Sequence, residues 1–443
     1  MKIHLFIFVF ALAVRLINIF FLDLNPATYL LGDQNLYWNW ANKDAYTDNS
    51  IIHPSILTER MPGAVLFFKY LISFVGPNLF YIVLLQSVMD SFTCNILALG
   101  AGSLKKSYAL PAGILSSICP LMIICSSQIL SESLSLFLFS LFLCFSIFLY
   151  KSGKFYLIGL AGIMLGLLTF VRAYTFPLLV PIAFILSLSQ RLNGWSYKKT
   201  IMGFVVFLLL AILPLIPRLY ENINKYDTFK LTSQAGVHIA YWVLPEVLKV
   251  SKSINRSEAV QFVRNKVDET SMNRYFLDQG YGFLESKHVY FKDQKRISVA
   301  YEILSKQPKL IILGVWIKGT ILNLFSPSIV MDVRVQKLPH PSFIEEKNIL
   351  SWVSGLVLGS KSYLYGILIL SFSLVSLIGV LLAVLGVLRF YSSFPTLAVL
   401  GTLLAFYFFV ITGPIYGPKY RIPILPLIIL AQSSVLSKIN FKI

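Results

Sequence analysis

The sequence predicts an all-α polytopic membrane protein with about ten transmembrane helices, in a range of about 8 to 12, together with outer-face amphipathic helices and a large outer loop domain. The first reason is composition: the 443 residues are 56% hydrophobic and only 13% charged, and the mean hydropathy is +0.73. Soluble domains carry about 25% charged residues. The second reason is that long apolar runs alternate with short loops that contain Lys and Arg but no Asp or Glu.

The charges of these loops predict the orientation in the membrane, because short loops rich in Lys and Arg stay in the cytoplasm. The loop cations are Lys2, Lys105, Lys106, Lys151, Lys154, Arg191, Lys198, Lys199, Arg389, Lys438 and Lys442. Of the 20 acidic residues, all except Asp90 lie in segments on the other side. We therefore expect a multi-pass protein of the plasma (inner) membrane with both termini cytoplasmic and an extracytoplasmic active site. The net charge of +18 fits this topology and contact with anionic membrane lipids, and does not indicate nucleic acid.

The apolar runs divide the chain into three parts. The first run, 3–22, is long enough to span and lacks a small-residue cleavage site, so we expect a retained helix. Further runs predict spans at 78–101, 108–126, 130–150, 155–171, 174–189, 199–217, 362–388, 394–412 and 422–437. The parts are an N-terminal transmembrane module, 1–217, with a first outer loop, 23–77; an outer-face loop domain, 218–361; and C-terminal transmembrane helices, 362–443.

The run 309–325 is ambiguous. A span here would place Arg389 outside, and Trp316 and Lys318 lie near its middle. Aromatic and charged side chains suit the headgroup level of a bilayer, so we expect an interfacial or re-entrant helix.

Other polar residues in the apolar runs indicate structure rather than chemistry. Asp90 lies inside a predicted span, and we interpret it as a buried structural carboxylate with Arg15 of the first span as a candidate partner. We expect buried thiols, without a disulfide framework, at Cys94, Cys119, Cys125 and Cys144. The histidines lack ligand spacing, so none is assigned to a metal.

The first outer loop carries two acidic positions beside the bilayer. Asp33 opens a short amphipathic helix; it can cap the free N–H groups of that helix, and this role is compatible with chemistry. Glu59 precedes Arg60 in a Glu-Arg-Met-Pro-Gly stretch. This pair is either a solvated loop pair, or a carboxylate for a metal or hydroxyl beside a guanidinium for a phosphate.

Glu132 stands at the outer start of a predicted span, in a serine-rich stretch. An acidic group at a membrane helix end is costly unless it is satisfied, and therefore indicates a functional site; the alternative is a capping carboxylate. Arg172, Lys419 and Arg421 add cations on the same face. Singly they can reach lipid headgroups, and together they can surround an anion.

Five stretches carry a resemblance to a known family. They are Asp33 with Tyr37 and Ala41; Glu59-Arg60-Met61-Pro62-Gly63; Leu130-Ser131-Glu132; Leu168-Thr169-Phe170-Val171-Arg172; and Tyr420-Arg421-Ile422-Pro423-Ile424-Leu425-Pro426. In order and sidedness they resemble the polytopic glycosyltransferases of the C superfamily, in particular the branch of protein mannosyltransferases and aminoarabinose transferases that use polyprenyl-phosphate sugars. The chain departs from the mannosyltransferase branch at Gln34, where that branch has a second acid, and Ala173 follows Arg172.

The resemblance implies inverting transfer of a sugar from a polyprenyl-phosphate donor to an envelope glycan, lipid or protein acceptor. With the residue pattern, it assigns Asp33 and Glu132 as the catalytic acids, with Asp33 as general base or acceptor-positioning group. Donor-phosphate ligands are Arg60, Arg172, Lys419 and Arg421; substrate-positioning residues are Tyr37 and Tyr420; a candidate metal ligand is Glu59. No cofactor is firmly implied, and a divalent metal ion stays an open alternative.

Two other classes of protein share this outline. An envelope polysaccharide polymerase or ligase would depend on arginines of the large outer loop and not on Asp33. A transporter or flippase of lipid-linked sugars would favour internal repeats and ionisable groups at the bilayer midplane. The sequence contains no convincing repeat.

The topology predicts the location of reporter fusions. A reporter fused after residue 340 is expected outside the cytoplasm, and one fused at Ser392 inside, because the loop cations orient the helices. Alkaline phosphatase activity reports a location outside the cytoplasm, and the fluorescence of green fluorescent protein reports a location inside it. A fusion at 340 that reports inside would contradict the interfacial placement of 309–325.

Overall fold

The computed structural model describes residues 2–42, 58–268, 287–341, 349–358 and 363–438, and regular structure in these ranges is helical. Seven helices are long and apolar enough to cross a membrane, or up to nine if two bent pairs each count as one span. The seven are α1 (Lys2–Phe20), α6 (Leu79–Leu104), α9 (Ser131–Ser152), Ala173–Leu192 with α11 (Leu179–Leu192), Tyr197–Tyr226 with α12 (Tyr197–Ile212) and α13 (Ile216–Tyr226), α22 (Tyr363–Ser393) and α23 (Pro395–Thr412). The chain is an all-helical integral membrane protein, as predicted.

Three predicted spans are not among these seven helices. The run 155–171 is α10 (Tyr156–Val171), which has 16 residues and is shorter than a span requires. The run 108–126 is two helices, α7 (Ala109–Ile118) and α8 (Pro120–Ser127), bent by 54°. The run 422–437 is a 3₁₀ turn, Pro418–Ile424, followed by α24 (Leu425–Leu436), which has 12 residues. A helix of that length covers about 18 Å, less than the apolar thickness of a bilayer. The break before α8 follows from Pro120, which has no N–H to continue the helix.

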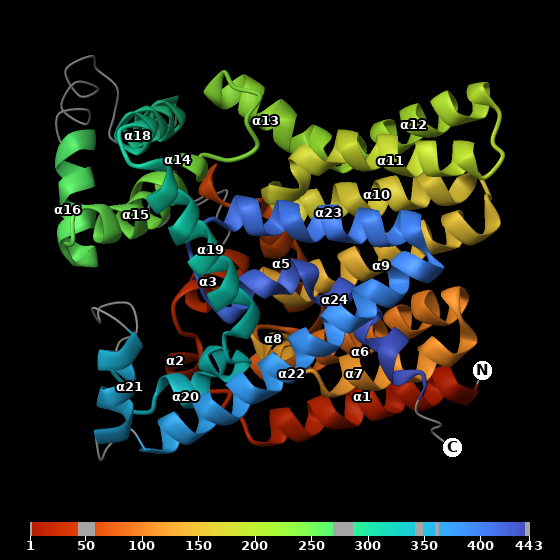
Figure 1. Ribbon diagram of the computed structural model, residues 1–443, viewed down its shortest axis with the longest axis horizontal. Helices are drawn as coiled ribbons and strands as arrows, with labels where there is room; N and C mark the ends of the chain where they lie inside the picture. Colours follow the sequence, from red (N-terminus) through yellow and green to blue (C-terminus); the bar gives the residue numbers. More distant parts are fainter. Residues whose placement is uncertain (1, 43–57, 269–286, 342–348, 359–362, 439–443) are drawn as a thin grey trace.

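The long helices lie side by side in a bundle (Figure 1). Helix α9 packs against α6 and against α10 (Tyr156–Val171), which also packs on α12; α1 packs on α6, and α24 on α22. Helix α1 begins and α24 ends at the same end of the bundle.

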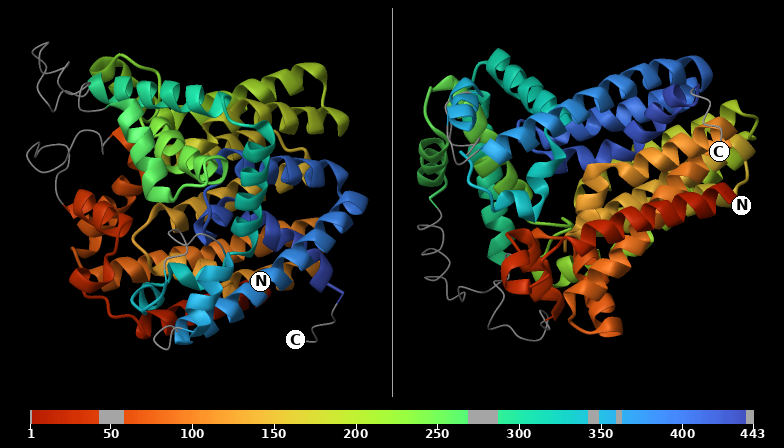
Figure 2. Two further views of the ribbon diagram at one scale, coloured as in Figure 1. Left: turned by 60° about the vertical axis from the view of Figure 1, so that its left-hand side comes forward. Right: turned by 90° about the horizontal axis from the view of Figure 1, so that it is seen from below.

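Short helices cover the opposite end, which we call the covered end. They are α2 (Pro26–Tyr29), α3 (Asp33–Asn42), α5 (Pro62–Val75), α14 (Ala235–His238), α15 (Leu244–Ser251), α16 (Arg256–Val267), α18 (Lys287–Ser305), α19 (Lys309–Phe325), α20 (Val333–Gln336) and α21 (Ile349–Leu358). The view from below in Figure 2 shows the elements from α14 to α20 gathered beyond the ends of the long helices. A small core of its own joins α15, α16 and α18, through Leu244, Leu248, Ala259, Val263 and Ala300.

Glycines let the helices of the bundle approach closely. A Cβ atom on Gly162 of α10 would lie 2.6 Å from the carbonyl oxygen of Phe207 on α12. Gly166, one turn further, faces Ala211 in the same way. Small residues replace bulk at such contacts because dispersion, not water exclusion, drives helix association in lipid.

Arg15 is fully buried and forms hydrogen bonds at the break between α7 and α8. Its guanidinium forms an ion pair with Asp90 of α6 at 2.5 Å, which confirms the predicted partnership. It also donates to the carbonyl oxygens of Ser117 at 3.2 Å and Ser116 at 3.5 Å. These are the carbonyls whose helical partners are lost at Pro120 and at the bend after it. Arg15 therefore replaces the missing helix hydrogen bonds.

Helix α19 lies across the covered end and is bent by 115° from α18 (Figure 1). Its buried face consists of Val315, Gly319 and Asn323. Its exposed apolar side chains are spaced three and four residues apart: Leu310, Leu313, Ile317 and Ile321. A stripe of this kind suits the boundary between headgroups and acyl chains, so it supports the interfacial placement, which remains a prediction.

The role of Arg15 at the helix break can be tested by substitution. Arg15→Lys keeps a positive charge for Asp90, but one ammonium cannot also serve both carbonyls, so we expect a loss of about 1–3 kcal/mol in stability. In a Pro120→Ala background the new N–H can bond Ser116, and the loss from Arg15→Lys should be smaller. Thermal unfolding in detergent measures both. Equal losses in the two backgrounds would contradict the role at the break.

Candidate functional site

The site begins at the corner between α8 and α9, residues 126–130, and Gln86 holds this corner. Its side-chain Nε2 donates to three carbonyl oxygens, those of Gln128 at 2.8 Å and of Cys125 and Ser126 at 3.3 Å. Carbonyls at a helix C-terminus lack helical donors, and a buried one without a partner is costly. The carbonyls of Cys125 and Gln128 also accept from the backbone N–H groups of Gln128 and Leu130, so the buried Gln86 amide reinforces the end of α8.

Three further hydrogen bonds tie this corner to segments distant in sequence. Gln34 of α3 accepts from the backbone N–H of Ile129 at 3.0 Å. The side chain of Gln128 donates to the carbonyl of Met331, and Tyr29 donates to that of Ser127 at 2.8 Å. Gln34 therefore anchors α3 to the corner.

Glu132 and Arg172 form a largely buried ion pair at the end of this corner. The distance between Glu132 Oε1 and Arg172 Nη2 is 2.5 Å, and Arg172 Nε donates to Ser131 at 3.0 Å. Glu132 lies in the first turn of α9, and Arg172 follows the last residue of α10. The negative Glu132 therefore lies at the partly positive N-terminus of α9, and the positive Arg172 at the partly negative C-terminus of α10. Both arrangements are favourable. The carboxylate bonds to Arg172, and the capping residue of α9 is Leu130 without a side-chain cap.

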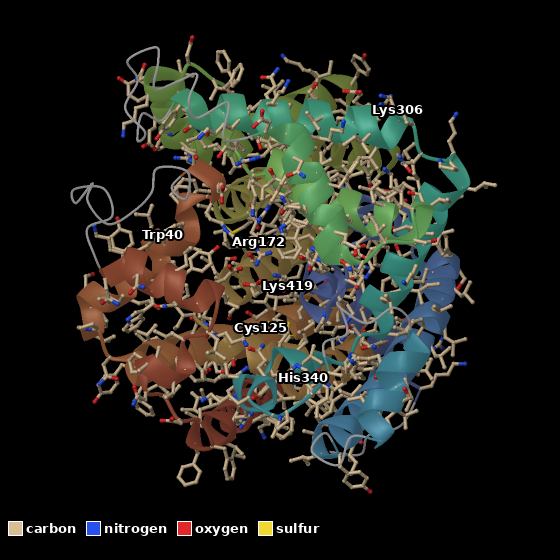
Figure 3. The ribbon with its side chains drawn as sticks, turned by 90° about the vertical axis from the view of Figure 1, so that its left-hand side faces the viewer. Trp40, Cys125, Arg172, Lys306, His340 and Lys419 are labelled. Atoms are coloured by element: carbon tan, nitrogen blue, oxygen red, sulfur yellow. The ribbon has the colours of Figure 1, made fainter. Side chains whose placement is uncertain are left out.

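Other predicted site residues surround this ion pair. The ammonium group of Lys419 is close enough to act on the charge of Glu132. Tyr37 of α3 is buried, with its ring beside those of Trp40 and Phe68. Figure 3 looks onto the covered end and shows Arg172 and Lys419 near one another in the middle of the face. Lys419 also acts on His238 of α14; burial, and then this charge, lower the pKa of His238. His238 therefore stays neutral at physiological pH.

Asp33 and Arg60 form a second, more open ion pair. The shortest distance between them is 3.4 Å, and their side chains are 45% and 31% exposed, respectively. Asp33 is the first residue of α3 itself, and Gly32 before it has a φ of +54°. Backbone carbonyls of Leu31 and Gly32 accept from the first N–H groups of the helix. Within the described ranges, the Asp33 carboxylate therefore has no capping hydrogen bond, contrary to the cap that the sequence suggested.

The Glu-Arg-Met-Pro-Gly stretch is held against the end of α10. A Cβ atom on Gly63 would lie 2.6 Å from the carbonyl oxygen of Phe170, so only glycine allows this approach. On the other side, Thr58 and Ser233 pair through their hydroxyls at 2.8 Å, and the N–H of Ser233 donates to the carbonyl of Thr58. These contacts bring Arg60 to the same end of α10 as Arg172.

Arg421 is buried and holds the end of α19. Its guanidinium donates to the carbonyl of Leu324 and, at 3.0 Å, to the hydroxyl of Ser328. Burial lowers its pKa, and no carboxylate of the described residues forms an ion pair with it. Tyr420 lies between Arg421 and Lys419, and the Lys419 ammonium is 5.4 Å from the centre of the Tyr420 ring.

The metal role of Glu59 stays a prediction. Among the described residues, no group of three or more His, Cys, Asp or Glu side chains could hold a metal ion. Glu59 lies outside any such group, so the open alternative of a divalent metal gains no ligand set here.

Three residues at the covered end, Gln86, His238 and Asn323, have structural contacts that were not predicted from the sequence. Gln86 and Asn323 are polar residues inside apolar runs. The same signal identified Asp90, and it could have identified these two residues as well. His238 lies in a polar segment and carries no such signal.

Comparisons with known proteins add the following. No family model matches the sequence, and no curated protein matches it either. Among solved structures, the chain is similar to the crystal structure of ArnT from Cupriavidus metallidurans in the apo state, with 11% sequence identity, a TM-score of 0.37, and coverage of 96% of this chain and 77% of that chain. The functional assignment therefore rests on the residues of this chain.

The corner that carries Glu132 can be tested at Gln86. Gln86→Met keeps the length of the side chain but leaves three carbonyls without their shared donor, so we expect a loss of stability of about 1–3 kcal/mol and lower activity. Gln432→Met is the matched control, because Gln432 donates to one carbonyl, that of Gly379. Thermal unfolding compares them. A larger loss at Gln432 than at Gln86 would contradict this account of the corner.

Proposed function

We propose that the protein is an integral membrane glycosyltransferase that transfers a sugar from a polyprenyl-phosphate donor to an envelope glycan, lipid or protein acceptor. The observation that carries the proposal is the Asp33–Arg60 pair. It offers an accessible carboxylate that its own helix does not use, beside a cation, at the end where the apolar bundle meets the polar covering helices. The resemblance of the sequence motifs points to the same chemistry.

In the proposed reaction, a hydroxyl or amine of the acceptor attacks the anomeric carbon of the donor sugar. The new bond forms at that carbon while its bond to the phosphate oxygen breaks, with inversion of configuration. The acceptor proton passes to Asp33, and polyprenyl phosphate leaves with the bonding electrons. A carboxylate near the acceptor and cations near the phosphate are what such a step requires.

The two predicted catalytic acids differ in their surroundings, and this favours Asp33 as the base. Its side chain is 45% exposed and 3.4 Å from its cation. Glu132 is 7% exposed and 2.5 Å from Arg172, which already neutralises it. A base must reach the proton that it removes. We assign Glu132 to hold Arg172 and the adjoining phosphate-binding side chains in place.

The departing phosphate gains negative charge and needs nearby cations. Arg60 faces Asp33, and the Lys419 side chain is exposed near Glu132. Arg421 is a buried guanidinium without a carboxylate partner among the described residues, an arrangement that an anion would stabilise. The Arg172 side chain is 25% exposed beyond its ion pair with Glu132. These four cations are the proposed phosphate ligands, with Tyr37 and Tyr420 beside them.

Asp33→Asn tests the proposed base. The substitution keeps the shape of the side chain and a hydrogen bond to Arg60 but removes proton acceptance. We expect glycan transfer to fall by about 100-fold to 10,000-fold, with near-normal expression. The measurement is mass analysis of envelope glycans and lipids from a deletion strain complemented with each variant.

The control is Asp23→Asn, because Asp23 is a carboxylate of the same loop whose partner is the hydroxyl of Thr28, at 2.9 Å. This variant should transfer normally. A folded Asp33→Asn protein with ordinary transfer would remove Asp33 as the base. An unchanged glycan profile in the deletion strain, or a loss of polymer length instead of a single sugar, would favour a transporter or a polymerase.

A further inference from the structure

The turn before Lys419 spans Gly413–Gly417. Its two glycines do not restrict its backbone to one conformation. Gly413 and Gly417 have φ values of +67° and +148°, a region that other residues rarely adopt. Glycine loses more backbone entropy on folding than any other residue. The turn therefore depends on hydrogen bonds from outside it.

Asn323 of α19 supplies two of these hydrogen bonds with one amide group. Its Nδ2 donates to the carbonyl of Ile415 at 3.0 Å, and its Oδ1 accepts from the N–H of Gly417 at 2.9 Å. The side chain is 1% exposed. A buried amide with both a donor and an acceptor satisfied holds one backbone arrangement and disfavours others.

Other contacts of α19 hold the same segment. Trp316 donates to the carbonyl of Val410 at 3.2 Å. A Cβ atom on Gly319 would lie 2.7 Å from Cα of Pro414, so the helix and the turn are in backbone contact. The carbonyl of Leu324 accepts from Arg421. Helix α19 thus contacts this segment before, within and after the turn.

The turn leads directly into the 3₁₀ turn Pro418–Ile424, which carries Lys419 and Arg421. We propose that Asn323 is a positioning residue that fixes the Ile415–Gly417 backbone and thereby aims Lys419 at the donor phosphate. The inference rests on the proposed function, because it concerns the same phosphate. It adds that the affinity for the phosphate depends on Asn323, an uncharged side chain of α19.

The test is binding of undecaprenyl phosphate to the full-length protein in nanodiscs, with undecaprenol as the reference lipid that lacks the phosphate. Asn323→Ala removes two hydrogen bonds that hold the turn, and we expect phosphate-selective affinity to fall about tenfold, the equivalent of about 1.4 kcal/mol. Gln432→Ala is the control, because it also removes a buried amide from a helix contact, here the one between α24 and α22. It should change the selectivity less than twofold.

The outcomes separate this inference from the proposed function. Wild-type protein that binds both lipids equally would overturn the proposed function and this inference with it. Phosphate-selective wild-type protein together with an equally selective Asn323→Ala variant would overturn this inference alone. Equal losses of selectivity in Asn323→Ala and Gln432→Ala would show a general packing role for Asn323, and would also overturn it.

Discussion

Inside a bilayer every backbone donor and acceptor must find its partner within the protein, and the α7–α8 break meets this constraint through Arg15. The guanidinium binds two carbonyls at the break and an aspartate of the neighbouring helix. Helix α8 can then leave the direction of α7 by 54°. That change of direction brings the end of α8 to the position where Gln86 binds it, and so it sets where α9 and its first-turn Glu132 begin. The candidate site at the covered end thus depends on an ion pair within the bundle.

Neutral amides hold much of the backbone of the covered end, beside charged groups such as Arg421. The amide side chains that bind backbone groups of other segments there include Gln34, Gln86, Gln128 and Asn323. An amide can donate and accept at once without the desolvation cost of a buried charge. The carboxylate of Asp33 and the ammonium group of Lys419 lie at exposed positions, and Arg60 is half-buried beside Asp33.

Much of the fold could be predicted from apolar runs, because the bilayer requires long apolar helices and leaves little choice of structure. The pairing of Arg15 with Asp90 could be predicted for the same reason, since two isolated charges in lipid need one another. The break at Pro120 was missed because hydropathy is the same for a straight and a bent helix. The cap that the sequence allowed at Asp33 does not form, because Gly32 adopts a positive φ and the helix starts at Asp33 itself, one residue earlier than a cap at this position requires.

The site was predictable in its membership more than in its pairings. The structure brings Glu132, Arg172 and Lys419 to one end of the bundle, while their compartment and their role stay predictions. Which cation bonds which carboxylate depends on helix rotation, and a sequence does not report it. His238 comes within the electrostatic influence of Lys419 through the folding of α14 over the bundle, and local sequence does not report this proximity.

The Arg15–Asp90 pair also has an electrical consequence. The voltage across an energised membrane acts on net charge, with about 2.3 kcal/mol for each elementary charge moved through 100 mV. Arg15 and Asp90 are opposite charges 2.5 Å apart and deep inside the bundle, so their combined charge is zero and their separation across the field is small. The membrane potential therefore exerts almost no force on them, and the helix break that they stabilise keeps its geometry whether the cell is energised or depolarised.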